Sequence, residues 1–209
     1  TEHLQTEPEP WEFRTKPAWQ RLLVMAGGVL FNFALAILTY SLILGIWGES
    51  YVPNKGNKIY VNELAYDMGF RNGDRILSFD DYVPENFGML QANLARESAS
   101  KAVVLRDGDT INIYIDHSRM GEILNSPGMF ALARPFVVDQ VPSSSPNYEA
   151  GLVSDDRIIL IDSTEIRFVQ DAEPVLSEKA GQTVQTAVLR GDDTLSMNLQ
   201  VDSLGKFGI

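Results

Sequence analysis

Two stretches of the chain decide its fold: DMGFRNGDRILSFDD at residues 67–81 and YEAGLVSDDRIILIDST at residues 148–164. Both run from a glycine turn through an acidic turn into an apolar strand that ends in aspartate. The aligned pairs, each 82 residues apart, are Gly69 and Gly151, Phe70 and Leu152, Asp74 and Asp156, and Asp80 and Asp162. A solenoid unit spans roughly 20–45 residues, so a repeat this long predicts two tandem domains.

The same order of elements surrounds both stretches. Each copy is expected to close with a hairpin, AVVLRDGDTINIYID at residues 102–116 and TAVLRGDDTLSMNLQVD at residues 186–202. Alternating apolar and polar residues along these strands are typical of a sheet with one buried face and one wet face. The other expected elements are a first strand (58–61 and 136–141), an apolar strand (75–79 and 157–161) and an amphipathic helix (85–97 and 169–178).

A long apolar segment precedes the repeat. No charged residue occurs between Arg21 and Glu49, and roughly 20 apolar residues are enough to cross a bilayer. The segment 22–47 therefore predicts a transmembrane helix. A cleaved signal peptide is disfavoured, because its apolar region is only about 7–15 residues long.

Charged and aromatic residues flank this segment. The cations are Arg14, Lys16 and Arg21 before it and Lys55 and Lys58 after it. This bias favours a cytoplasmic N-terminal side. Trp19 and Trp47 lie at its two ends, where interfacial aromatic residues belong, and Trp11 and Phe13 are expected to touch the interface.

Gly27, Gly28 and Asn32 stand out within the apolar segment. Glycines let another helix approach closely. An amide in hydrocarbon is costly unless it faces a partner or a wet cavity, which makes Asn32 a functional candidate. A structural hydrogen bond between helices is the equally good alternative.

The remainder of the chain is acidic. The whole chain has a net charge of −11, and residues 48–209 carry 14 Lys+Arg against 24 Asp+Glu. Such a surface repels nucleic acid and anionic lipid, so nucleic-acid binding is disfavoured. The absence of cysteine excludes disulfides and cysteine metal ligands.

The second copy, AGLVSDDRIILIDSTEI at residues 150–166, resembles the PDZ signature of bacterial envelope proteases. The first copy has residues 68–70 as Met-Gly-Phe in place of Ala-Gly-Leu, Asp155 replaces a usual glycine, and neither strand is followed by Asp-Gly. The resemblance implies two α+β PDZ-like domains, each a small, strongly bent β-sheet or barrel capped by helices. Its signature turns are Gly69, Phe70, Asp74, Gly151, Leu152 and Asp156.

One such helix directly before two PDZ-like copies resembles the RseP-like, site-2-type intramembrane zinc proteases. In that family a Gly-Pro-x-x-Asn-type motif lies in the second core helix and tandem PDZ domains follow it. Here residues 27–33 read GGVLFNF, with glycine where proline is common, and residues 12–28 also resemble the family's approach to that helix. The resemblance covers nearly the whole chain.

The resemblance implies an activity that this chain does not carry alone. The family's zinc centre is His-Glu-x-x-His on the preceding helix plus the aspartate of a Leu-Asp-Gly motif after the PDZ domains. The histidines here are His3 and His117 only, so no catalytic or metal-binding residue is expected, and zinc would be held in the parent protein by ligands outside this chain.

The whole protein would then be a membrane zinc metalloendopeptidase of the bacterial inner membrane that cleaves transmembrane substrates such as membrane-anchored regulators. Asn32, Gly27 and Gly28 would bind substrate within the bilayer. The PDZ pair would lie on the extracytoplasmic side and filter substrates by size or bind peptides. Alternatives are a non-catalytic membrane-anchored tandem-PDZ adaptor, structural spacers without a ligand, and an HtrA-like fragment, which would carry a serine protease domain instead of the apolar helix.

The expected boundaries follow from these patterns. They are a juxtamembrane segment (1–21), the transmembrane helix (22–47), a first PDZ-like domain (51–118), a linker (119–134), a second PDZ-like domain (135–203) and the start of an incomplete following segment (204–209).

Overall fold

The computed structural model describes residues 12–209 and divides into two compact units, residues 1–50 and residues 51–209. The expectation for Trp11, the histidine His3 and the first half of the juxtamembrane segment lie outside the described residues. Each unit is built on its own sequence pattern, and each is described below by itself.

The first unit holds a 3-10 turn, η2 (Phe13–Thr15), and one long helix, α1 (Ala18–Trp47). The helix begins after Pro17, four residues earlier than the apolar run alone predicts, because proline suits the entry to a helix. It ends at Gly48, whose φ of 68° is favoured by glycine and whose N–H bonds to the carbonyl of Leu44 at 2.9 Å.

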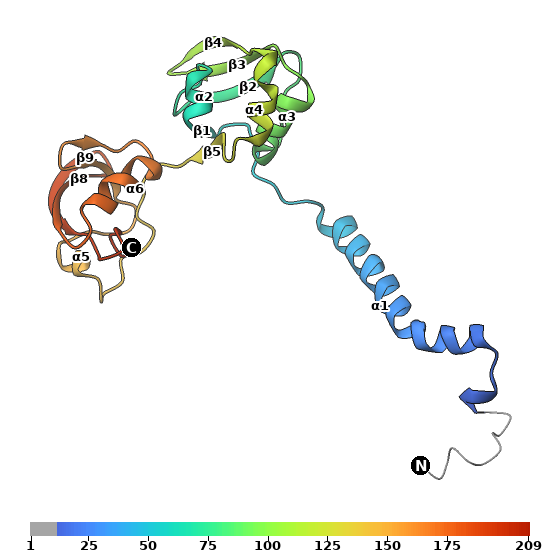
Figure 1. Ribbon diagram of the computed structural model, residues 1–209. Helices are drawn as coiled ribbons and strands as arrows, with labels where there is room; N and C mark the ends of the chain where they lie inside the picture. Colours follow the sequence, from blue (N-terminus) through green and yellow to red (C-terminus); the bar gives the residue numbers. More distant parts are fainter. Residues whose placement is uncertain (1–11) are drawn as a thin grey trace. The chain divides into compact units, whose positions relative to one another are not determined.

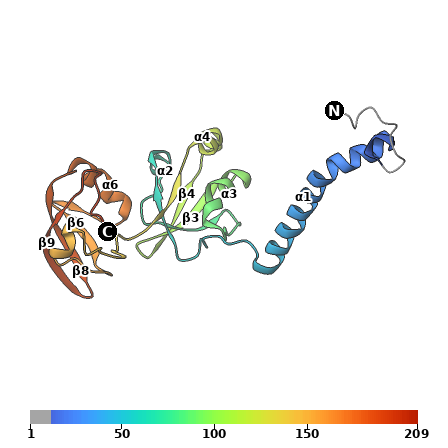
Figure 2. The same cartoon turned by 90° about the horizontal axis from the view of Figure 1, so that it is seen from below.

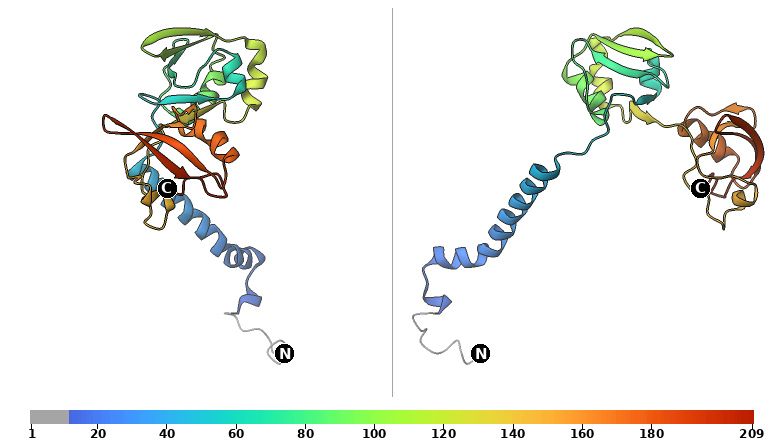
Figure 3. Two further views of the ribbon diagram at one scale, coloured as in Figure 1. Left: turned by 90° about the vertical axis from the view of Figure 1, so that its left-hand side faces the viewer. Right: turned by 180° about the vertical axis from the view of Figure 1, so that it is seen from behind.

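No side chain of α1 is buried among the described residues. Its most apolar window has a mean hydropathy of 2.2, so its length and composition are sufficient to cross a membrane. The helix bends in its N-terminal half (Figure 3), the part that contains Gly27 and Gly28. Adjacent glycines are a known cause of such bends.

The second unit contains two β-rich repeats with short helices (Figure 1). In the first repeat, a three-stranded antiparallel sheet has the order β2-β3-β4, and β1 pairs separately with β5. The elements are β1 (Lys58–Val61), α2 (Glu63–Asp67), β2 (Arg75–Phe79), η3 (Phe87–Met89), α3 (Leu90–Arg96), β3 (Lys101–Arg106), β4 (Asp109–Tyr114), η4 (His117–Arg119), α4 (Met120–Asn125) and β5 (Phe130–Ala133).

The second repeat has the sheet order β7-β6-β8-β9, all antiparallel. Its central strands β6 and β8 match β2 and β3, and α6 matches α3. The elements are α5 (Pro146–Glu149), β6 (Arg157–Ile161), β7 (Thr164–Glu165), α6 (Val169–Glu178), β8 (Thr183–Arg190) and β9 (Asp193–Gln200).

The repeats agree in fine detail as well as in element order. The register of β2 on β3 shifts between Ile76 and Ser78, and that of β6 on β8 shifts between Ile158 and Leu160. Both shifts fall at the same place in the repeat, 82 residues apart. A bulge at a matched position strengthens the local twist in the same way in both sheets.

The hairpin turns follow from their sequences. Asp107 and Gly108 join β3 to β4 with φ values of 50° and 99°, as a two-residue type I′ turn requires. Gly191 opens the corresponding turn between β8 and β9 with φ 60°. The Asp-Gly and Gly-Asp pairs therefore fix the register of both hairpins.

Each repeat encloses its own apolar core. The first is built around Phe70, Phe79, Leu90 and Leu94, all fully buried, and the second around Leu152, with Ile158, Ile161, Val188 and Leu199. Apart from Phe70 and Leu152, which lie in the glycine turns, these residues are the alternating or one-face apolar positions of the strands and helices. The inward face of each element is thus the face that the sequence pattern predicts.

Three segments differ from the expectation. The stretch 119–134, expected to be a linker, contains α4 and β5, and β5 pairs with β1 of the first repeat. The stretch 204–209, expected to begin a further segment, packs on the second core through Phe207, which is 2% exposed. The first strand expected over 136–141 is reduced to one bridge between Val137 and Arg157, since it has no partner like β5 among the described residues.

Candidate functional site

The six signature residues of the repeats hold the fold together. Asp74 is fully buried and accepts two hydrogen bonds from Arg106, from Nε at 2.7 Å and from Nη2 at 2.8 Å. Arg106 also donates to the carbonyl of Gly69 at 2.8 Å. In the second repeat Asp156, Arg190 and Gly151 repeat this arrangement with the same three distances.

We call each arrangement an Asp–Arg clamp. A bidentate arginine–carboxylate pair is strong and geometrically specific. The hydrogen bonds from Arg190 lower the pKa of the Asp156 carboxyl, and the same pairing raises the pKa of the Arg190 guanidinium. The pKa of Arg106 is raised by its hydrogen bonds to Asp74. Each clamp connects the glycine turn to the strands.

The other signature residues have equally structural places. Gly69 and Gly151 adopt φ values of 107° and 88°, and Phe70 and Leu152 are buried in their cores. Where glycine is replaced, aspartate takes the strained conformation, because Asp155 has φ 69° in the position of Gly73. Aspartate tolerates the left-handed region better than most residues.

A groove of about 480 Å³ opens in the second repeat between α6 and the C-terminal residues 202–209. Its floor is apolar, and Glu173 and Lys206 bring one charge of each sign to its walls. The residues of α6 in the groove are Val169, Ala172, Glu173, Leu176 and Ser177; the remaining lining includes Phe136, Leu204, Phe207 and Ile209. An apolar groove with a few polar groups is the usual form of a ligand site.

Two polar side chains hold the loop that forms one wall of this groove. Asn147 is 1% exposed, donates to the carbonyls of Gln200 and Phe207 at 2.9 and 2.7 Å, and accepts from the Gln200 N–H at 2.7 Å. The carboxylate of Asp202 accepts from the N–H groups of Leu204 and Lys206, both at 2.8 Å. The wall is therefore preformed.

Sequence reasoning missed this groove. The signal for it is a second repeated motif, Ser-x-Gly-x-Phe, which occurs at residues 126–130 and at residues 203–207. In both places the glycine has a positive φ, 62° at Gly128 and 71° at Gly205. The predicted signature residues, in contrast, do not line the groove.

Of the three candidate residues of the apolar helix, Gly28 lies about one turn before Asn32. Asn32 lines a shallow hollow of about 410 Å³ with Ala36 and Thr39 on one face of α1. Nothing in the described residues lies within 4 Å of a side chain built at Gly27 or Gly28. This face is therefore open to another helix.

The described residues do not form a zinc site. Within residues 12–209, no three His, Cys, Asp or Glu residues are grouped to hold a metal ion. His117 is exposed, and its Nε2 lies 2.8 Å from the Ser100 hydroxyl. We therefore derive no catalytic step from these residues.

Comparison with known proteins identifies one domain type. A PDZ domain profile matches residues 126–201, from the loop before β5 to the residue after β9. The PDZ assignment thus covers the second repeat, and its match begins in the loop that precedes the strand paired with β1.

Curated relatives are named as metalloproteases. A zinc metalloprotease of Mesorhizobium japonicum is 28% identical over 114 residues, covering 54% of this chain and 31% of the relative. The metalloprotease MmpA of Caulobacter vibrioides is 31% identical over 103 residues, 48% of this chain and 26% of the relative. A zinc metalloprotease of Neisseria meningitidis serogroup A is 25% identical over 206 residues, 93% of this chain and 46% of the relative.

The alignment with the Neisseria relative spans 93% of this chain, so it extends over both the apolar helix and the β-rich repeats. The chain spans less than half the length of these three relatives. Taken with the PDZ match and the order of helix and repeats, these matches show that the chain is similar to zinc metalloproteases of the RseP-like, site-2 type.

Proposed function

We propose that this chain is the middle portion of an intramembrane zinc metalloprotease that cleaves transmembrane substrates. The observation that carries the proposal is the order of parts. A 30-residue apolar helix with no buried side chain is followed by two β-rich repeats, each of which contains its own Asp–Arg clamp. The names of the curated relatives agree with it. Zinc would be bound by residues outside this chain.

In this proposal α1 spans the bacterial inner membrane and both repeats are PDZ-like domains on the extracytoplasmic side. The groove of the second repeat supports peptide binding there. A PDZ groove takes an extended peptide as an added strand, with side-chain pockets giving specificity. The pair would gate or bind substrates, such as membrane-anchored regulators, before the bilayer-embedded centre cuts them.

Asn32 is the residue of this chain that we place nearest the reaction. Its amide would hold the backbone of the substrate in an extended form, or donate a hydrogen bond to the substrate carbonyl oxygen that becomes negatively charged during cleavage. Gly27 and Gly28 would let the substrate helix approach closely. Its position on an open helix face with Thr39 supports this role.

The test is cleavage of a transmembrane reporter by the full-length parent protein in membranes. Asn32→Ala should slow cleavage by about 10²–10³-fold, the usual effect of losing one such donor. Thr39→Ala, on the same helix face, is the matched control and should leave the rate near that of the wild type. Similar rates for both variants, at equal protein levels, would remove Asn32 from the site.

The parent reading frame supplies an independent check. His-Glu-x-x-His about one helix upstream and Leu-Asp-Gly downstream would support the protease. If neither motif is present, a membrane-anchored tandem-PDZ adaptor becomes the better account.

A further inference from the structure

The two repeats differ by one insertion at the groove. The second repeat reads Asp202-Ser-Leu-Gly-Lys-Phe207, and the first reads Asp116, then residues 117–125, then Ser126-Pro-Gly-Met-Phe130. The two repeats have the same backbone hydrogen bond just before each aspartate. The N–H of Ile115 donates to the carbonyl of Ser100, and the N–H of Val201 donates to the carbonyl of Gln182, both at 2.8 Å. Residues 117–125 are therefore extra in the first repeat.

The inserted residues form η4 and α4, which lie beside α3 (Figure 2). Ile123 of α4 is fully buried and belongs to the same apolar cluster as Leu90 and Leu94 of α3. The side-chain amide of Gln91, also on α3, donates to the carbonyls of Ile123 and Ser126 at 2.5 and 2.7 Å.

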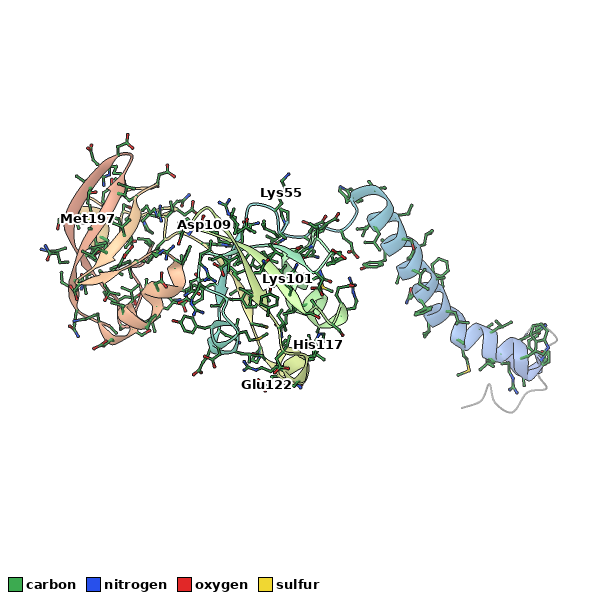
Figure 4. All side chains as sticks on the ribbon, turned by 90° about the horizontal axis from the view of Figure 1, so that it is seen from above. Lys55, Lys101, Asp109, His117, Glu122 and Met197 are labelled. Atoms are coloured by element: carbon green, nitrogen blue, oxygen red, sulfur yellow. The ribbon has the colours of Figure 1, made fainter. Side chains whose placement is uncertain are left out.

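Apart from Arg119 and Met120, which are half-buried, the rest of the insertion faces solvent. His117 and Glu122, labelled in Figure 4, are exposed at the edge of the first repeat, and Leu124 is 65% exposed. The insertion is thus held by the buried side chain of Ile123, by the half-buried Met120 and by a hydrogen bond from Gln91 to the carbonyl of Ile123. A bound peptide is held in a groove by the same two kinds of contact.

Equivalent helix positions show what the insertion covers. Ser177 and Glu173 of α6 line the open groove of the second repeat and are exposed. Their counterparts 82 residues earlier, Ala95 and Gln91 of α3, are half-buried. The first repeat therefore has the same groove wall, and α4 lies against it.

We propose that the segment His117–Asn125 is a built-in occupant of the groove in the first repeat. A tethered segment competes at an effective concentration in the millimolar range, so a free peptide of ordinary affinity does not displace it. The first repeat is closed at rest, and open peptide binding belongs to the second repeat. The inference concerns the chain's own residues and holds whether or not the parent protein is a protease.

The natural absence of cysteine allows a direct test on the full chain in detergent micelles. Ala95→Cys and Ser177→Cys place one thiol at the equivalent position of each groove, and labelling by a maleimide measures its accessibility. We expect the Ala95→Cys thiol to react at least about tenfold more slowly than the Ser177→Cys thiol, as a group behind a locally closed segment does.

Deleting residues 117–125 gives the first repeat a loop as short as that of the second. The labelling rate of the Ala95→Cys thiol should then become similar to that of the Ser177→Cys thiol. Val104→Cys, at a fully buried position, is the folding control and should remain protected in the deletion variant. Ile123→Ser keeps the segment but removes its buried anchor, and it should also speed labelling at Ala95→Cys. If the Ile123→Ser variant leaves Val104→Cys protected, its first repeat is folded. The labelling rate of the Ala95→Cys thiol in that variant then tests the proposal even if the deletion variant unfolds.

Equal labelling of the Ala95→Cys and Ser177→Cys thiols in the otherwise intact chain would overturn the proposal. Continued slow labelling at Ala95→Cys in the Ile123→Ser variant would overturn it as well, because the wall would then be covered by something other than α4.

Discussion

Truncating the arginine of each Asp–Arg clamp should destabilise both repeats, and the first more than the second. Asp74 and Asp156 have no exposed side-chain surface, whereas the side chains of Arg106 and Arg190 are 26% and 40% exposed. Arg106→Ala or Arg190→Ala therefore leaves a buried carboxylate without its charge partner. The difference in arginine exposure sets how easily water replaces that partner.

The magnitude follows from the burial. Removing one partner of a buried ion pair costs about 3–5 kcal/mol, and solvent access reduces this. We expect the free energy of unfolding to fall by about 3–4 kcal/mol for Arg106→Ala, and by less for Arg190→Ala because Arg190 is more exposed. Every 1.4 kcal/mol is tenfold in an equilibrium, so the open population should rise roughly 100- to 1,000-fold for Arg106→Ala and by a smaller factor for Arg190→Ala.

The assay reads each repeat separately through one buried thiol. Val104→Cys and Val188→Cys occupy matched strands and are fully buried, so each is labelled only when its own repeat opens. Arg96→Ala is the control, because Arg96 pairs with Glu97 on the surface, where an ion pair contributes little to stability.

A change of less than about fivefold in either repeat would refute the reasoning that the clamp carries a buried, uncompensated charge when broken. A larger effect for Arg190→Ala than for Arg106→Ala would refute the argument from solvent access, even if both variants were destabilised.

Two further predictions concern the second repeat. Because the folded-state pKa of Asp156 is lowered, its charge stabilises the fold above the unfolded pKa of about 3.9, and this stabilisation is lost as the pH falls through the folded value. The difference in Tm between wild type and Asp156→Asn, followed by circular dichroism, should therefore shrink below about pH 4, and a difference unchanged down to pH 2 would contradict this. Gly205→Ala should destabilise by about 2–4 kcal/mol, because φ is 71° and the new Cβ would lie 3.0 Å from the backbone of α6. Gly191→Ala, at φ 60° with open space around it, should cost about 1 kcal/mol when both are measured through the Val188→Cys thiol.

The repeat made much of the fold predictable. A matched run of glycine, aspartate and apolar residues identified β2 and β6, and the Asp-Gly and Gly-Asp pairs placed the hairpin turns. The clamp itself was not predictable from spacing, because the aspartate and arginine are 32 and 34 residues apart in the two repeats. Their contact depends on how the strands pair, which a local pattern does not specify.

The groove was missed for a different physical reason. Residues 204–209 are short and rich in glycine, so they carry no helical or strand period, and their place is set by Asn147 and Asp202 rather than by local propensity. Residues 119–125 of the insertion were likewise expected to belong to a linker. A helix of six residues, such as α4, is not stable by itself and depends on packing, which Ile123 provides here.

A comparison of matched positions separates the residues that hold the fold from those that shape the groove. The clamp residues are identical in both repeats, whereas the groove positions change, from Gln91 to Glu173 and from Met129 to Lys206. If both repeats were spacers without a ligand, the second repeat would have no need of an open groove, and a groove covered like that of the first repeat would be equally suitable. Instead, the first repeat places an amide at position 91 that bonds to its own inserted segment, and the second places a carboxylate that has no such segment to bind. A peptide for the open groove should therefore bring apolar side chains to its floor and an N–H or cationic group to Glu173.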